Sequence, residues 1–256
     1  MHIDLNADLG EGFGAYTLGD DKALLEVLSS ANVACGFHAG DPVIMRDMVT
    51  ATHTMGVDLG AHVGFPDLIG FGRRVMHIAP QELACYVVYQ LGALAGMATS
   101  AGSHLSHMSF HGALGNLVAA DKELANTLIA AVASFDANLI ISSSTSQAIE
   151  QAAARYGLRV ATTFLADRAY DSRGLLVPRS QPNAVISDHT QVRQRLRQLL
   201  NDGTVTCYSG ERIPIHAKSI LLHGDTPGAV ALAHSIRDEI ENSGGIITPI
   251  SRMRYA

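Results

Sequence analysis

Asn32-Val33-Ala34-Cys35-Gly36-Phe37-His38-Ala39-Gly40-Asp41-Pro42 carries the strongest signal of fold class in the chain. Its apolar start is typical of a buried strand, and a histidine among small residues follows. Asp41 and Pro42 then suit the start of a helix, because aspartate caps free backbone N–H groups and proline fixes a helical φ. The helical pattern of residues 43–55 comes next. The stretch therefore predicts a unit of strand, polar tip and helix.

The same strand ending recurs three more times along the chain. An apolar run ends in a histidine beside glycine or alanine at residues 61–64, 110–113 and 222–225. The four histidines are His38, His62, His111 and His223. In folds built from parallel strands, the carboxyl ends of the strands meet on one face, where ligands bind. We therefore expect the histidines to surround one mouth, as candidate general acids or bases.

Predicted strands and helices alternate along the whole chain, which indicates a parallel sheet. We expect strands at residues 3–8, 31–35, 57–62, 106–110, 137–141, 158–164 and 219–222, with a short one at 245–250. We expect helices at residues 20–28, 42–55, 80–101, 121–134, 145–156, 188–200 and 227–242. This number of units favours an α/β fold with one domain over residues 1–256, a (β/α) barrel of seven or eight parallel strands. A doubly wound open sheet is the alternative.

Composition limits the partners and the compartment that we expect. The formal net charge is −6 and no basic stripe is visible, which argues against a nucleic-acid partner. Cys35, Cys85 and Cys207 are widely spaced without a CxxC pair, which is typical of a reducing compartment. Residues 1–4 lack the pattern of a signal peptide, and we expect no segment long enough to span a bilayer. The sequence thus predicts a cytoplasmic protein without a membrane partner.

The first predicted strand carries polar groups that suit a metal or a hydrogen-bond network. Residues 3–8 alternate between apolar and polar side chains, which places the polar ones on one face. Asp8 with His38 and His62 could hold a divalent metal, since carboxylate and imidazole suit zinc or manganese. The same residues could equally form a network without an ion. Both interpretations stay open at this stage.

Arginines stand in the two longest predicted loops. Arg73 and Arg74 lie in one, and Arg168 follows Asp167 in the other. Loop arginines often bind carboxylate or phosphate groups, although ion pairs that anchor the loop explain them as well. The chain contains neither a GxSxG elbow nor a Walker A motif. A serine hydrolase triad and a P-loop nucleotide site are therefore not predicted.

Several long motifs in the same order resemble the LamB/YcsF family of 5-oxoprolinase A subunits, and the likeness spans nearly the whole chain. The motifs lie at residues 4–12, 32–41, 60–62, 70–74, 111–114, 166–170 and 223–227. The resemblance implies a (β/α) barrel similar to that of polysaccharide deacetylases. It also implies ATP-dependent opening of the lactam 5-oxoproline to L-glutamate, together with partner subunits B and C.

The resemblance further implies roles for individual residues. Candidate catalytic residues are Asp8, Glu11, His38, His62 and His111. Candidate substrate- or phosphate-binding residues are Asn6, Asn32, Asp41, Arg73, Arg74, Asp167, Arg168, His223 and Asp225. ATP, with Mg²⁺, is the implied cofactor, and a tightly bound transition metal is a further candidate.

The chain departs from the family pattern at five positions. Ser109 and Thr163 stand where the family usually has lysine and glutamate, and Val63, Gly115 and Arg173 replace the usual proline, tyrosine and aspartate. Lysine and glutamate at strand ends hold phosphate or move protons, so these differences bear on the activity and not on the fold. Three alternatives therefore stay open: a metal-dependent amide hydrolase of the deacetylase type, a member with another lactam substrate, and a non-catalytic subunit.

Overall fold

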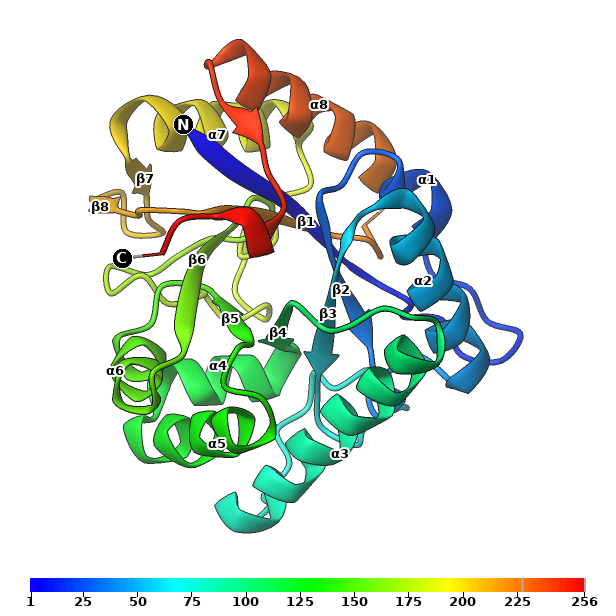
Figure 1. The fold of residues 1–256 in the computed structure, drawn as a ribbon. Coiled ribbons are helices and arrows are strands. Elements are labelled where there is room, and N and C mark those ends of the chain that lie inside the picture. Colours follow the sequence, from blue (N-terminus) through cyan, green and yellow to red (C-terminus); the bar gives the residue numbers. More distant parts are fainter. Residues whose placement is uncertain (227, 256) are drawn as a thin grey trace.

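A computed structural model describes residues 1–226 and 228–255, and it has a closed barrel of parallel strands at its centre (Figure 1). The barrel strands, in spatial order, are β1 (His2–Leu9), β2 (Ser30–Ala34), β3 (Asp58–Val63), β4 (His107–Phe110), β5 (Ile140–Ser143), β6 (Arg159–Leu165) and β9 (Ser219–His223). Pairing of β9 with both β6 and β1 closes the ring. The predicted barrel of seven parallel strands is thus confirmed, and the open sheet is excluded.

Helices surround the barrel on the outside (Figure 1). They are α1 (Asp21–Leu25), α2 (Pro42–Met55), α3 (Pro80–Ser100), α4 (Gly112–Ala120), α5 (Lys122–Phe135), α6 (Gln147–Tyr156), α7 (His189–Asp202) and α8 (Ala229–Asn242). Local signals set their ends: the Asp41 carboxylate accepts from two N–H groups at the start of α2, and Gly56 ends that helix in the left-handed conformation. The predicted start of the last helix, residue 227, lies outside the described residues.

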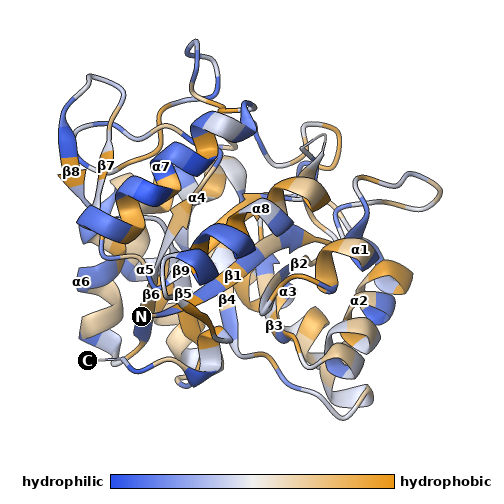
Figure 2. Cartoon of the chain, turned by 90° about the horizontal axis from the view of Figure 1, so that it is seen from above, coloured by the Kyte–Doolittle hydropathy of each residue, from blue (hydrophilic) through white to orange (hydrophobic). Residues whose placement is uncertain are grey.

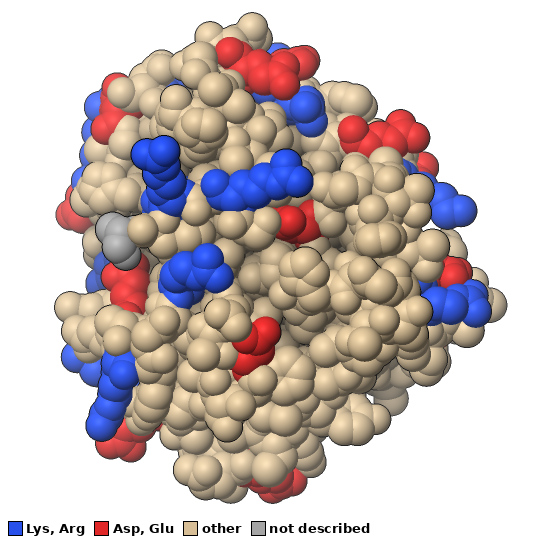
Figure 3. Space-filling view, in the orientation of Figure 1, with Lys and Arg blue, Asp and Glu red and all other residues tan. Residues whose placement is uncertain are grey.

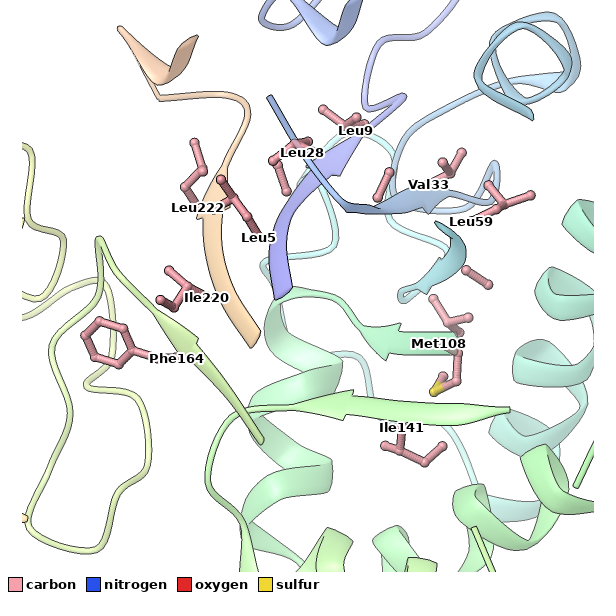
Figure 4. Packing of buried hydrophobic residues seen from close by; sticks show 14 of the residues in the cluster. Leu5, Leu9, Leu28, Val33, Leu59, Met108, Ile141, Phe164, Ile220 and Leu222 are labelled. Carbon is pink, nitrogen blue, oxygen red and sulfur yellow. The ribbon is translucent and has the colours of Figure 1, made fainter. Parts of the chain in front are cut away.

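The two faces of the strands differ in character, which fixes the strand register. Side chains such as Leu5, Leu9 and Val33 point away from the barrel toward the helices and are fully buried there (Figure 4). Each large aliphatic side chain removed from water contributes roughly 1.5–3 kcal/mol. Figure 2 shows hydrophilic residues on the outward side of α7, while hydrophobic colour gathers around the strands. A shift of one residue would exchange these faces, so the apolar burial holds the register.

The barrel interior, by contrast, is polar along much of its length. Asp4, Asn6 and Asp8 of β1 point inward and are buried. In the middle layer, His107 Nε2 lies 2.9 Å from Asn32 Oδ1, and Asn32 Nδ2 donates to Asp8 Oδ1 at 2.9 Å. Gly60 leaves room for the His107 ring, because an added Cβ would overlap it. The alternation of the first strand therefore reports an inward polar face, as one of the two sequence interpretations had it.

The C-terminal segment covers the amino-terminal end of the barrel (Figure 1). Strand β10 (Ile246–Ile247) adds to the edge of β1, and a 3-10 turn, η1 (Ile250–Arg252), follows. The Ile250 N–H donates to Ser30 Oγ at 3.2 Å, and the Ser251 N–H donates to Asp58 Oδ2 at 2.7 Å. Ligands therefore have to reach the barrel from the other end, where the strands finish.

Four elements differ from the sequence prediction. Helix α4 forms where a loop was expected; its Gly115 lets it lie against the end of β4, and glycine conceals a helical pattern. Strand β5 begins at Ile140 and not at residue 137. The predicted run at residues 213–218 is replaced by an antiparallel hairpin of β7 (Thr204–Thr206) and β8 (Arg212–Pro214). The last strand is two residues long, because η1 follows it.

Helix α3 corrects one further expectation. It has 21 residues and is long and apolar enough to cross a membrane by length and composition alone. In the structure it packs on the barrel and buries Leu83, Val87, Leu91 and Leu94. Its apolar length is thus used for packing against its neighbours. The face of the molecule in Figure 3 carries acidic and basic side chains interspersed among uncharged ones.

Candidate functional site

A pocket of about 510 Å³ opens at the carboxyl ends of the strands. Its polar lining includes Asp8, His62, Arg73, Ser109, His111, Thr163, Arg168, Arg179 and His223. Three of the four histidines at the predicted strand ends therefore line one pocket, and His38 lies directly behind His111 with the two rings stacked at 3.8 Å. The prediction of a shared mouth is confirmed.

His223 and Asp167 form a buried hydrogen-bonded pair beside the pocket. His223 Nδ1 donates to both Asp167 oxygens, at 2.9 and 2.7 Å. Burial alone would lower the pKa of His223, but the Asp167 charge outweighs it and raises the pKa. The hydrogen bond also fixes the ring so that Nε2 faces Asp8, with 4.0 Å between Nε2 and Oδ2. This nitrogen is placed to exchange a proton with a ligand in the pocket.

Asp8 and His62 form a second pair at the pocket floor, with 3.4 Å between Asp8 Oδ2 and His62 Nε2. Burial favours the neutral forms of both, yet each stabilises the charge of the other. The pKa of Asp8 is lowered despite burial, because of His62, His223 and the Asn32 amide. The pKa of His62 is raised despite burial, because of Asp8 and Glu11. The floor therefore carries an aspartate held ionised beside an imidazolium.

Glu11 lies among three histidines just behind this floor. Glu11 Oε1 is 3.4 Å from His38 Nε2, 3.4 Å from His111 Nδ1 and 3.9 Å from His62 Nε2. Burial, together with the Asp8 charge, raises the pKa of Glu11 to about 8. Burial and neighbouring histidines keep the pKa values of His38 and His111 well below the ordinary value. This group is buried throughout and chemically distinct from the His223–Asp167 pair.

The loop between β3 and α3 holds these rings in place. The Phe71 carbonyl accepts from His111 Nε2 at 2.8 Å. Gly72 has a φ of +60°, and an added Cβ there would meet the His38 Cβ at 2.7 Å. Only glycine therefore suits both the backbone conformation and the space. The glycine-rich motif at residues 70–74 thus builds the wall of the site.

Arginines line the rim and one wall of the pocket. Arg73 donates to Asp225 Oδ2 at 2.8 Å and lies over the Phe71 ring. Arg168 is buried and donates to the carbonyls of Ala184 and Val177, at 3.2 and 2.7 Å. Burial and the charge of Arg179 lower the pKa of Arg168 to about 10. Cations that raise each other's energy in this way favour an anionic ligand between them.

Arg179 is a pocket residue that the sequence reasoning did not select. Its only signal was its place in the long polar loop after the sixth strand, next to Pro178. Burial and the charge of Arg73 lower the pKa of Arg179. The loop, and not a strand end, brings it to the site, which a strand-based argument could not foresee.

Several predicted binding residues lie away from the pocket or at its edge. Arg74 forms an ion pair with Asp67 on the surface, so the anchoring interpretation holds for it. Asp41 caps α2 and also accepts from the Gly14 N–H at 2.8 Å, which is a structural role. Asn6 and Asn32 lie in the barrel below Asp8, where they hydrogen-bond to each other. These placements correct the expectation that all of them line the binding site.

The two departures from lysine and glutamate meet in the pocket. Ser109 and Thr163 both line it. Ser109 Oγ lies 2.7 Å from His62 Nδ1, and Thr163 Oγ1 lies 2.9 Å from Ser142 Oγ. Ser142, on the strand between them, fills the distance. The prediction that both changes touch one site is therefore confirmed by their positions.

Known proteins are similar to this chain over its length. The model of the LamB/YcsF family matches residues 3–255. The first of the 5-oxoprolinase A subunits named in Pseudomonas syringae pv. tomato is 66% identical, over 99% of each chain. The second of those named in Ralstonia nicotianae is 59% identical, over 98% of this chain and 97% of its own. The crystal structure of the lactam utilization protein from Thermus thermophilus superimposes with a TM-score of 0.90 at 37% identity, covering 98% of this chain and 100% of that one.

Proposed function

Because the chain belongs to the LamB/YcsF family, we propose that it is the A subunit of a 5-oxoprolinase. The reaction is the opening of the lactam 5-oxoproline (pyroglutamate) to L-glutamate with ATP and Mg²⁺, in the cytoplasm. Partner subunits B and C complete the enzyme. The names of the relatives at 66% and 59% identity support the reaction and the subunit role.

The observation that carries the proposal is the pairing of cations and a proton-transfer group in one pocket. Arg73, Arg168 and Arg179 present positive charge to an anion such as the carboxylate of 5-oxoproline or a phosphate. His223, fixed by Asp167, faces the same space. A small anionic lactam would thus be bound at one end and reached by an acid or base at the other.

The chemistry needs three events at the lactam. A water oxygen attacks the carbonyl carbon, the C–N bond breaks, and the ring nitrogen receives a proton. Because a lactam carbonyl is a poor electrophile, ATP would supply the phosphoryl group that activates its oxygen. We assign proton delivery to His223 Nε2, whose raised pKa favours the protonated ring. The positive charge at His62, beside Asp8, would stabilise negative charge that develops near the pocket floor.

The proposal is tested by measuring glutamate release from 5-oxoproline with the purified chain, with and without subunits B and C and with and without ATP. We expect turnover only when the three subunits and ATP are all present. Robust ATP-dependent turnover by the isolated chain would contradict the need for partners. Absence of turnover by the complete set would contradict the reaction itself.

A metal-dependent amide hydrolase is a second candidate, supported by the buried group of Glu11 with three histidines. Such an enzyme would cleave its amide without ATP. Assays with a panel of lactams and N-acetyl compounds in the absence of ATP separate the two functions. Cleavage that does not depend on nucleotide would favour the hydrolase, or a family member with another lactam substrate.

A further inference from the structure

We propose that Glu11, His38, His62 and His111 form a tetrahedral site for a divalent cation of the zinc class, directly behind the pocket floor. This site goes beyond the proposed function, because it stands on four side chains and not on the lactam, ATP or the partner subunits. It also differs from the set considered on sequence grounds, since Glu11 and His111 join His38 and His62 in place of Asp8.

The spacing of the ligand atoms fits such an ion. An ion about 2.1 Å from each of four atoms holds them about 3.4 Å apart, because a tetrahedral edge is about 1.6 bond lengths. Glu11 Oε1 lies 3.4, 3.4 and 3.9 Å from His38 Nε2, His111 Nδ1 and His62 Nε2. His62 Nε2 and His111 Nδ1 are 2.9 Å apart. The four atoms therefore already stand near the corners of a tetrahedron.

The polar atoms of the cluster lack the partners that a network without an ion would provide. Within the described part of the chain, Glu11 Oε1 and both ring nitrogens of His38 are buried without a hydrogen-bond partner. Buried polar atoms are seldom left unpaired, because water is lost and nothing replaces it. A single cation between Glu11 Oε1 and His38 Nε2 satisfies both atoms at once.

Outer contacts orient two of the rings as metal ligands require. The Phe71 carbonyl can only accept, so His111 Nε2 carries the proton and Nδ1 turns its lone pair toward the cluster. Ser109 Oγ can accept from His62 Nδ1, which leaves Nε2 facing the same point. Hydrogen bonds of this kind commonly fix the tautomer of ligating histidines.

Four protein ligands would fill the coordination shell, which is the arrangement of zinc sites that hold structure. The ion would take the place of the proton on His62 Nε2, so the pocket floor keeps its positive charge. It would also tie His62 and His111, which line the pocket, to His38 and Glu11 behind them. We therefore assign the ion a positioning role for the floor of the site.

The test uses the full-length chain, stripped with a chelator and then given Zn²⁺ or Co²⁺. We expect one zinc per chain by elemental analysis after desalting, and the strong visible absorption of tetrahedral Co²⁺. His38→Gln and Glu11→Gln should bind zinc more than ~100-fold more weakly in competition with a chromophoric chelator, and Ser109→Ala roughly 10–100-fold more weakly, as for loss of an outer contact. Circular dichroism checks that each variant is folded.

His223→Gln is the matched control, because His223 is a nearby buried histidine outside the cluster. It should keep wild-type zinc affinity. A rival site of Asp8, His62 and His223 would reverse the pattern, with binding lost in His223→Gln and kept in His38→Gln. That reversal, the absence of stoichiometric zinc, or an octahedral Co²⁺ spectrum in the wild type would overturn the proposal.

Discussion

The two ends of the barrel interior hold buried aspartates of the same strand in opposite surroundings. At the amino-terminal end, Asp4 accepts from the hydroxyls of Ser29, Ser30 and Ser219 at 2.6–2.7 Å. At the other end, Asp8 lies beside His62. Burial raises the pKa of Asp4 to about 6, although its three hydroxyl donors oppose the rise, whereas the charge of His62 lowers the pKa of Asp8.

The difference shows that the neighbours of a buried carboxylate, and not burial alone, decide its charge. Hydroxyl donors satisfy Asp4 without supplying a cation, and the C-terminal segment covers that end. Cationic partners keep Asp8 ionised next to an open pocket. We therefore expect changes near Asp8 to affect chemistry, and changes near Asp4 to affect stability.

The largest expected effect is on the chemical end. His223→Gln should lower the turnover of the assembled enzyme by roughly 10²–10⁴-fold, because glutamine cannot transfer the proton. Thermal unfolding of the chain should change little. His53→Gln, at an exposed position on α2, is the control and should leave turnover unchanged. Near-normal turnover in His223→Gln would remove this residue from the mechanism.

The next effect concerns pH and the structural end. Asp4 has a folded pKa of about 6 against 3.8 for a free side chain, so folding favours its protonated form. Its contribution to stability is therefore fully present below pH 3.8 and is lost as the pH rises through about 6. The loss amounts to about 3 kcal/mol, at about 1.4 kcal/mol per pKa unit.

Urea unfolding of the wild type and of Asp4→Asn between about pH 4 and pH 7 measures this contribution. The difference in unfolding free energy between the two proteins should change with pH in that window, since asparagine does not titrate. Asp47→Asn, which is exposed on α2, serves as the control and should show no such difference. A difference that stays constant with pH would mean that Asp4 is ionised throughout.

A smaller effect links the two ends. Gly60→Ala should destabilise the fold by roughly 1–3 kcal/mol, because the added methyl group overlaps the His107 ring. Displacement of His107 also disturbs Asn32, which donates to Asp8. Turnover per folded molecule should therefore fall as well. Gly96→Ala, in α3 with open space around it, should not destabilise the chain.

The smallest effect tests the departures in the pocket. Ser109→Lys together with Thr163→Glu should raise 5-oxoproline opening by a few-fold, at roughly 1 kcal/mol per fivefold change, and by more than either change alone. Each charge added singly would lack its partner in the pocket. The wild type and the three variants are assayed with the same B and C subunits. Full wild-type activity, or purely additive effects, would show that the two positions are not a coupled pair.

Sequence patterns alone were sufficient to predict the barrel and the composition of its mouth. Alternating strands and helices leave few topologies, and a histidine at the end of a parallel strand has to face the same side as the others. Residues 3–8 also revealed the polar interior through their period of two. These features are local and periodic, so no knowledge of distant contacts was needed.

Which polar residues act together became clear only from the packing of the chain in three dimensions. Asp41 and Arg74 look like ligands in sequence, but a helix start and Asp67 already engage them. Arg179 reaches the pocket because a long loop folds over it, and Glu11 meets three histidines from other segments. A side chain offers the same atoms to a cap, an ion pair or a ligand, and the path of the chain through space selects among them.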